Sequence, residues 1–176
     1  MKKVLLVALL FTAFISAAAA PVEAPPGTPA IPNGRVPMDG LLSGGQPTPE
    51  HIEQAARAGY RTVINLREPS EPGFAWEAEK VKALGMDYIA FPVAGAASLT
   101  RENVERFDAV LDAALAKGPV LLHCGSGNRD GALLALRAAW LDGMDPERAI
   151  ELGKAAGLTR LEPAVRALLA APVTEP

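Results

Sequence analysis

The chain has 176 residues, of which 49% are hydrophobic and 21% charged, and its formal net charge is −3. This length supports one domain with a substantial core, not two. A mildly acidic chain argues against binding to nucleic acid or to anionic membranes, because both partners need a basic surface.

The first twenty residues have the pattern of a secretory signal peptide. Lys2 and Lys3 make a positive start, and the apolar run Val4–Ile15 is too short to span a bilayer comfortably. Residues 16–20 are all small, as a signal peptidase requires. We therefore expect residues 1–20 to be removed. The mature protein would then be periplasmic or secreted, with no attachment to the membrane.

A proline-rich segment follows the signal peptide. Residues 21–37 contain six prolines spread along the segment and show no periodic pattern, which is typical of an extended leader. We expect the folded domain to span residues 38–171 and residues 172–176 to form a frayed tail.

Strand and helix patterns alternate along residues 38–171. Short apolar or β-branched runs predict strands, and runs opened by an N-cap or proline and closed by glycine predict helices. The alternation indicates an α/β fold, a mainly parallel sheet flanked by helices, with ligands bound at the carboxyl ends of the strands. The expected strands are residues 41–45, 61–66, 86–93 and 120–123, and the expected helices are 49–58, 74–84, 101–117, 130–141, 146–156 and 161–169.

The loop after strand 120–123 carries the residues suited to chemistry. Gly125 and Gly127 allow a turn whose backbone N–H groups point inward and cradle an anion. The start of the next helix adds positive potential, and Arg129 offers a planar fork to two phosphate oxygens. The same field would stabilise a thiolate on Cys124, which is the nucleophilic form.

Cys124 is the one cysteine of the chain, so it cannot form an internal disulfide. The alternative to a nucleophile is a buried, inert thiol. His123 either orients the loop through hydrogen bonds or is an ordinary core histidine. Two histidines and one cysteine make no metal-ligand cluster, so we expect neither a metal nor another cofactor.

The motif His123-Cys124-x-x-Gly127-x-Arg129 resembles the phosphate loop of cysteine-dependent phosphatases of the tyrosine and dual-specificity type. Upstream, Ser43–Glu50 and Gly59–Arg67 are similar to the phosphatase-like domain of bacterial beta-lactamase hydrolase-like proteins. The resemblance covers most of residues 38–142. It implies a phosphatase-like fold with the cysteine loop between a central strand and a helix.

The resemblance also implies a role for each matching position. Cys124 would attack phosphorus and carry a phosphocysteine, while the loop amides and the Arg129 side chain would bind the phosphate. The implied phosphate-binding residues are Gly125, Ser126, Gly127, Asn128 and Arg129. The supporting residues, which would line the pocket or brace its loops, are His123, Asp130, Gln46, Asn65 and Arg67.

Three features differ from the usual phosphatase pattern. One residue fewer than usual separates Cys124 from Arg129. Asp130 replaces a serine or threonine that helps the thiolate leave; an aspartate there would cap the helix, and its charge would oppose an incoming anion. The stretch Pro92–Ala97, where a general-acid aspartate is usual, contains no acid. The remaining candidates for that acid are Glu68, Glu71 and Glu77.

Three functions remain open from the sequence. The first is hydrolysis of a phosphate monoester, with a phosphorylated substrate of unknown identity, slowed by the absence of the usual acid. The second is rhodanese-like sulfur transfer through a persulfide on Cys124, because sulfurtransferases share the short loop. The third is a non-catalytic domain that binds anions or senses redox state through the thiol.

Overall fold

The computed structural model describes residues 26–73 and 75–171. The expected signal peptide, the first part of the proline-rich segment and the tail at 172–176 lie outside the described residues. Within the described ranges, every helix is too short or too polar to cross a bilayer.

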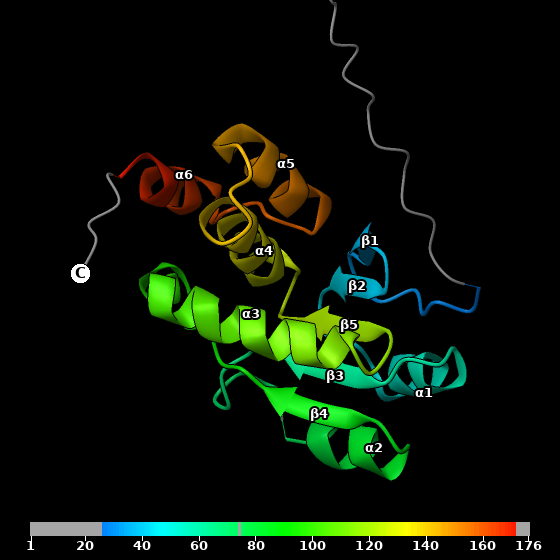
Figure 1. Cartoon of the computed structure of the whole chain (residues 1–176). Helices are drawn as coiled ribbons and strands as arrows, with labels where there is room; N and C mark the ends of the chain where they lie inside the picture. Colours follow the sequence, from blue (N-terminus) through cyan, green and yellow to red (C-terminus); the bar gives the residue numbers. More distant parts are fainter. Residues whose placement is uncertain (1–25, 74, 172–176) are drawn as a thin grey trace, which may run out of the picture.

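Five strands form one sheet in the order β1-β2-β5-β3-β4 (Figure 1). β1 pairs antiparallel with β2, and the other pairs are parallel. The expected α/β fold with a mainly parallel sheet is thus confirmed, and β5 lies at its centre. The strands are β1 (Arg35–Met38), β2 (Leu41–Gly44), β3 (Thr62–Asn65), β4 (Asp87–Ala90) and β5 (Val120–His123).

Helices cover both faces of the sheet (Figure 1). On one face lie α1 (Pro49–Arg57) and α2 (Glu77–Ala83); on the other lie α3 (Arg101–Leu115) and α4 (Asn128–Trp140). Two further helices, α5 (Pro146–Ala155) and α6 (Glu162–Ala170), pack against α4, and η1 (Ala96–Ser98) is a single 3-10 turn.

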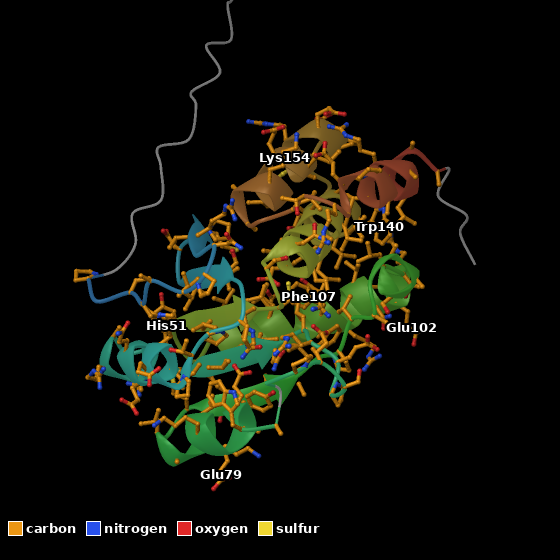
Figure 2. All side chains as sticks on the ribbon, turned by 180° about the vertical axis from the view of Figure 1, so that it is seen from behind. His51, Glu79, Glu102, Phe107, Trp140 and Lys154 are labelled. Atoms are coloured by element: carbon orange, nitrogen blue, oxygen red, sulfur yellow. The ribbon has the colours of Figure 1, made fainter. Side chains whose placement is uncertain are left out.

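Strand β5 contributes to both cores because successive side chains of a strand point to opposite faces. Leu121 packs in the cluster beneath α1 and α2, whereas Val120 and Leu122 pack in the cluster beneath α3 and α4. Phe107 of α3 is fully buried between its helix and the sheet (Figure 2). Burial on both faces is the reason that β5 reads as a continuous apolar run.

The folded region begins before the expected boundary at residue 38. β1 lies inside the segment expected to be a leader, and Ile31 is only 4% exposed. Ile31 packs against Gly44, where a Cβ would lie 2.7 Å from the Ile31 Cδ1 atom. The antiparallel pairing of β1 with β2 and the contact of Ile31 with Gly44 therefore order this part of the proline-rich segment. Its proline content alone predicts an unfolded leader.

The carboxyl ends of the parallel strands meet at one edge of the sheet. Gly44 is the last residue of β2, the Cys124 loop follows β5, and Leu66 follows β3. Backbone bonds tie them together: Cys124 N–H donates to Gly44 O at 3.2 Å, and Leu66 N–H donates to His123 O at 2.8 Å. This edge is where an α/β fold places its ligand.

Candidate active site

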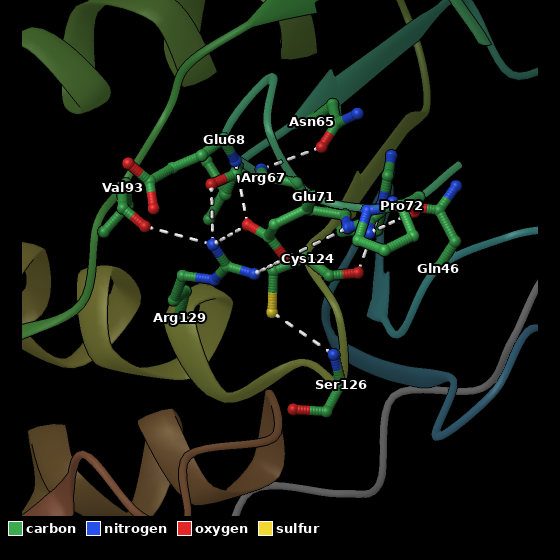
Figure 3. Close-up of polar contacts among 12 residues, drawn as sticks. Gln46, Asn65, Arg67, Glu68, Glu71, Pro72, Val93, Cys124, Ser126 and Arg129 are labelled. Atoms are coloured by element: carbon green, nitrogen blue, oxygen red, sulfur yellow. Dashed lines mark hydrogen bonds and ion pairs between the residues drawn. The ribbon is translucent and has the colours of Figure 1, made fainter. Parts of the chain in front are cut away.

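The loop between β5 and α4 wraps its backbone around the Cys124 sulfur. Gly127 N–H donates to Sγ at 3.1 Å and Ser126 N–H donates to it at 3.5 Å (Figure 3, which draws the bond from Ser126). The turn depends on Gly127, whose φ of 90° lies in the left-handed region that side chains with a Cβ disfavour. The thiol itself is 2% exposed.

The surroundings of Cys124 act on its pKa in opposite directions. Burial raises the pKa, because it penalises the charged thiolate. The backbone N–H groups of Ser126 and Arg129, the nearby Asp130 side chain and the Arg129 charge together outweigh burial and lower the pKa below its ordinary value. The arrangement therefore favours the nucleophilic form of the sulfur.

Arg129 is held in place by a carboxylate and by two strand-end carbonyls. Its Nη1 and Nη2 atoms donate to the two Glu71 carboxylate oxygens at 2.6 and 2.9 Å (Figure 3). Nη1 also donates to Leu66 O at 3.3 Å and to Val93 O at 3.1 Å. The bonds from Arg129 lower the Glu71 pKa to about 2, so this carboxylate is charged at neutral pH.

A guanidinium has two edges that can each grip a pair of oxygens. Glu71 occupies the edge formed by Nη1 and Nη2. Among the described residues, no carboxylate or carbonyl oxygen is bonded to Nε. The positive charge of Arg129 also interacts favourably with the Cys124 sulfur. The edge formed by Nε and Nη2 is thus the one available to an anion above Cys124.

Arg67 binds the Glu71 carboxylate, and Gln46 in turn binds Arg67. Arg67 is 6% exposed; its Nε donates to the Glu71 carboxylate at 3.2 Å, its Nη2 to Pro72 O at 2.5 Å and its Nη1 to Gln46 Oε1. The Arg67 and Gln46 side chains thus stabilise the β3–α2 loop. Neither residue lines the cavity over Cys124.

His123 and Asn65 meet a buried carboxylate on the other side of the loop. His123 Nε2 lies 2.7 Å from Glu77 Oε1, and neither side chain is exposed to solvent. Asn65 Nδ2 donates to Glu77 Oε2 at 2.9 Å, and Asn65 Oδ1 accepts from Arg67 N–H at 2.8 Å. These groups fix the ends of β3 and β5 relative to α2, and they are remote from solvent.

Asn128 supports the phosphate loop with its side chain and faces α6 rather than an anion. Its Oδ1 accepts from Thr159 N–H at 2.8 Å, from the Thr159 hydroxyl at 3.1 Å and from Leu161 N–H at 3.1 Å. These bonds hold the α5–α6 turn against the Cys124 loop. A contribution of Asn128 to phosphate binding would therefore come from its backbone.

Asp130 differs from the expectation in two ways. It does not cap α4, because the N-cap residue is Gly127 and Asp130 lies within the first turn. It is also completely buried, and burial together with the nearby Cys124 raises its pKa well above the ordinary value of 3.8. Asp130 Oδ2 accepts from Gly44 N–H at 3.0 Å. The raised pKa favours the neutral form of the Asp130 carboxyl, which repels an anion less than a carboxylate does.

An open cavity of about 570 Å³ lies over the Cys124 loop. Its far wall comes from the α5–α6 turn, and no local sequence pattern indicates this position. Likewise, no sequence signal distinguished Glu71 as the partner of Arg129, because Glu71 lies in the β3–α2 loop and Arg129 in the first turn of α4, 58 positions later. The cavity is lined by Glu68, Glu71, Ala94, Gly95, Cys124, Gly125, Ser126, Asn128, Arg129, Arg160 and Leu161.

Known proteins resemble this chain in both sequence and fold. The chain is 37% identical to the beta-lactamase hydrolase-like proteins of two Xylella fastidiosa strains, Temecula1 and 9a5c, over 122 residues. The match covers 66% of this chain and 27% of each relative. The chain therefore spans about a quarter of the length of the curated relatives it matches.

Solved phosphatase-type structures share the fold. A candidate phosphatase of the DUF442 group from Shewanella putrefaciens CN-32 has a TM-score of 0.62 and 26% identity, covering 80% of this chain and 90% of its own. A candidate phosphatase from Neisseria meningitidis Z2491 has a TM-score of 0.63 and 29% identity, covering 76% and 94%. TpbA of P. aeruginosa has a TM-score of 0.65 and 22% identity, covering 90% and 93%.

The family model for the phosphatase-like domain of beta-lactamase hydrolase-like proteins matches residues 36–140. This range includes the complete Cys124 loop and every residue of the sheet except Arg35. The chain thus belongs to the family of phosphatase-like domains found in beta-lactamase hydrolase-like proteins.

Proposed function

We propose that this phosphatase-like domain hydrolyses phosphate monoesters through a phosphocysteine on Cys124. The observation that carries the proposal is one arrangement: a buried sulfur receives two backbone N–H bonds, and beside it lies an arginine with one forked edge open toward the cavity. A phosphate above Cys124 would meet the N–H groups of the loop and the Nε and Nη2 atoms of Arg129.

The reaction would proceed in two displacements. The Cys124 thiolate attacks phosphorus, the S–P bond forms and the bond to the leaving oxygen breaks, giving an alcohol or phenol once that oxygen gains a proton. Water then attacks phosphorus, the S–P bond breaks, and inorganic phosphate and the thiolate are released. Arg129 and the loop amides stabilise the charge on the equatorial oxygens in both steps.

Hydrolysis of para-nitrophenyl phosphate tests the proposal, because its good leaving group needs little help from an acid. We expect measurable but slow turnover in the wild type and none in Cys124→Ser. The control is retention of the cooperative unfolding transition in the variant, since serine differs from cysteine by one atom. Equal turnover in the two proteins would contradict a nucleophilic Cys124.

The short loop from Cys124 to Arg129 keeps sulfur transfer as a second candidate, because a smaller cradle suits a persulfide. The same preparation distinguishes the two reactions. Cys124-dependent formation of thiocyanate from thiosulfate and cyanide, without phosphate release, would reverse the order of the candidates. Binding of vanadate with neither reaction would favour the non-catalytic anion-binding alternative.

The place of action follows from the expected signal peptide, and we propose export to the periplasm or beyond. N-terminal sequencing of the mature protein tests this part. A chain that begins near residue 21 is the expected result, and an intact Met1 on cytoplasmic material would contradict it.

A further inference from the structure

The general acid of the proposed reaction has to lie on the outer side of the cavity. In an in-line displacement the leaving oxygen departs from the side of phosphorus opposite to the attacking sulfur. The Cys124 sulfur lies at the floor of the cavity, 2% exposed, so the leaving group faces the opening. A carboxyl behind the sulfur, such as the fully buried Asp130, cannot reach it.

Two of the three candidate carboxyls are excluded by their partners. Glu77 is fully buried and bonded to Asn65, beside His123, and it does not line the cavity. Glu71 lines the cavity but is held by both Nη atoms of Arg129, with a pKa of about 2. Both of its carboxylate oxygens are engaged by Arg129, so Glu71 cannot turn toward a leaving group.

Glu68 has the position that an acid requires. It lines the cavity together with Ala94 and Gly95, which belong to the stretch where this chain has no acid of its own. It is half-buried, and no ion pair or hydrogen bond of its carboxylate is found among the described residues. Figure 3 shows Glu68 beside Glu71 and Arg129.

The backbone of Glu68 is fixed by the same carboxylate that orients Arg129. Glu68 N–H donates to Glu71 Oε1 at 2.8 Å, while Glu71 binds the Arg129 guanidinium. The Glu71 carboxylate therefore fixes the Glu68 backbone and the Arg129 guanidinium relative to each other. Such positioning of an acid relative to the bound group is what proton transfer requires.

We infer that Glu68 is the general acid of this site, supplied from the β3–α2 loop in place of a residue after β4. The inference rests on the proposed function. As the P–O bond to the leaving group breaks, the Glu68 carboxyl gives its proton to the leaving oxygen. In the second step the Glu68 carboxylate takes a proton from the attacking water, and the S–P bond breaks to release phosphate and the Cys124 thiolate.

The test compares Glu68→Gln with the wild type on two substrates, phenyl phosphate and para-nitrophenyl phosphate. Phenolate is the poorer leaving group and depends more on protonation. We expect kcat/KM for phenyl phosphate to fall on the order of 100-fold, with a much smaller loss for para-nitrophenyl phosphate. The basic limb of the pH profile for phenyl phosphate should also be lost.

Two control variants separate an acid from a structural residue. Glu79→Gln changes an exposed glutamate of α2 that points away from the molecule (Figure 2), and it should leave both activities unchanged. Glu71→Gln disturbs Arg129 and should lower both activities by similar factors. A loss in Glu68→Gln that is equal for both substrates, or no loss, would overturn the inference. Absence of any Cys124-dependent hydrolysis in the wild type would instead overturn the proposed function and the inference with it.

Discussion

The outer wall and the underside of the Cys124 loop each carry a carboxylic side chain, and the pKa values of the two are shifted in opposite directions. On the outer wall, Glu71 is bound by both Nη atoms of Arg129, and its pKa falls to about 2. On the underside, Asp130 is fully buried and bonded to Gly44 N–H, and its pKa rises. Residue type is similar in the two regions, so the environment decides the chemistry.

The difference matters because each charge state suits its place. A charged Glu71 fixes the arginine that would meet the phosphate, and a charged Asp130 would repel both the thiolate and the phosphate. The raised pKa of Asp130 favours its neutral form, and the Asp130 side chain in turn lowers the Cys124 pKa. The site thus combines two carboxyls, Glu71 and Asp130, whose pKa values are shifted in opposite directions.

Substitution of Arg129, in the outer region, should cause the largest loss of activity and of anion binding. Arg129→Lys keeps the charge but loses the fork that spans Glu71 and the anion. We expect kcat/KM for para-nitrophenyl phosphate to fall on the order of 100- to 1000-fold, with weaker vanadate binding by calorimetry and a retained fold. Equal vanadate affinity in the two proteins would remove Arg129 from the anion site.

Substitution of Asp130 should change the underside through the thiol. Iodoacetamide alkylation measured against pH reports the Cys124 pKa, which we expect to lie below the free-thiol value of about 8.5 in the wild type. Asp130→Ala removes a side chain that lowers the Cys124 pKa and should move the inflection upward. Asp130→Asn keeps an N–H donor and should move it less. An inflection that does not change in Asp130→Ala would show that Asp130 does not act on the thiol.

The two carboxyls should also give opposite dependences of stability on pH. Glu71 has a lowered pKa in the folded state, so its stabilisation is complete above the ordinary value of 4.5 and is lost as the pH falls toward about 2. The advantage of wild type over Glu71→Gln in urea unfolding should therefore shrink below pH 4.5.

Asp130 has a raised pKa in the folded state, and the sign is reversed. Above its ordinary value of 3.8 the unfolded chain releases the proton while the folded chain retains it, so stability falls as the pH rises. Asp130→Asn should therefore gain stability relative to wild type with increasing pH. Parallel pH curves for wild type and Asp130→Asn would show that Asp130 is not neutral in the fold.

The sequence predicted the parts of the molecule that depend on local chemistry. The apolar run at 120–123 was sufficient to predict β5, and the N-cap and proline at the start of the range 49–58 were sufficient to predict α1. Burial on both faces and helix capping leave such local patterns. β1 was missed because it is four residues long and contains Pro37, and its pairing with β2 orders it.

The properties of the site depend on distant partners, and the sequence could not show them. Asp130 looks like a helix cap in the sequence, yet it is buried beneath the loop, bonded to Gly44 N–H, and burial raises its pKa. Asn128 looks like part of an anion cradle, yet its side chain holds the turn at Thr159. Each role is set by a contact made across more than thirty positions of the chain.

The central claim is that the Cys124 thiolate attacks phosphorus, and trapping the intermediate tests it most directly. The wild type is mixed with para-nitrophenyl phosphate, quenched in acid within the first turnover, digested and examined by mass spectrometry. We predict one phosphoryl group on the peptide that contains Cys124, with none on that peptide in Cys124→Ser. Release of nitrophenol during that turnover with an unmodified Cys124 peptide would contradict the account.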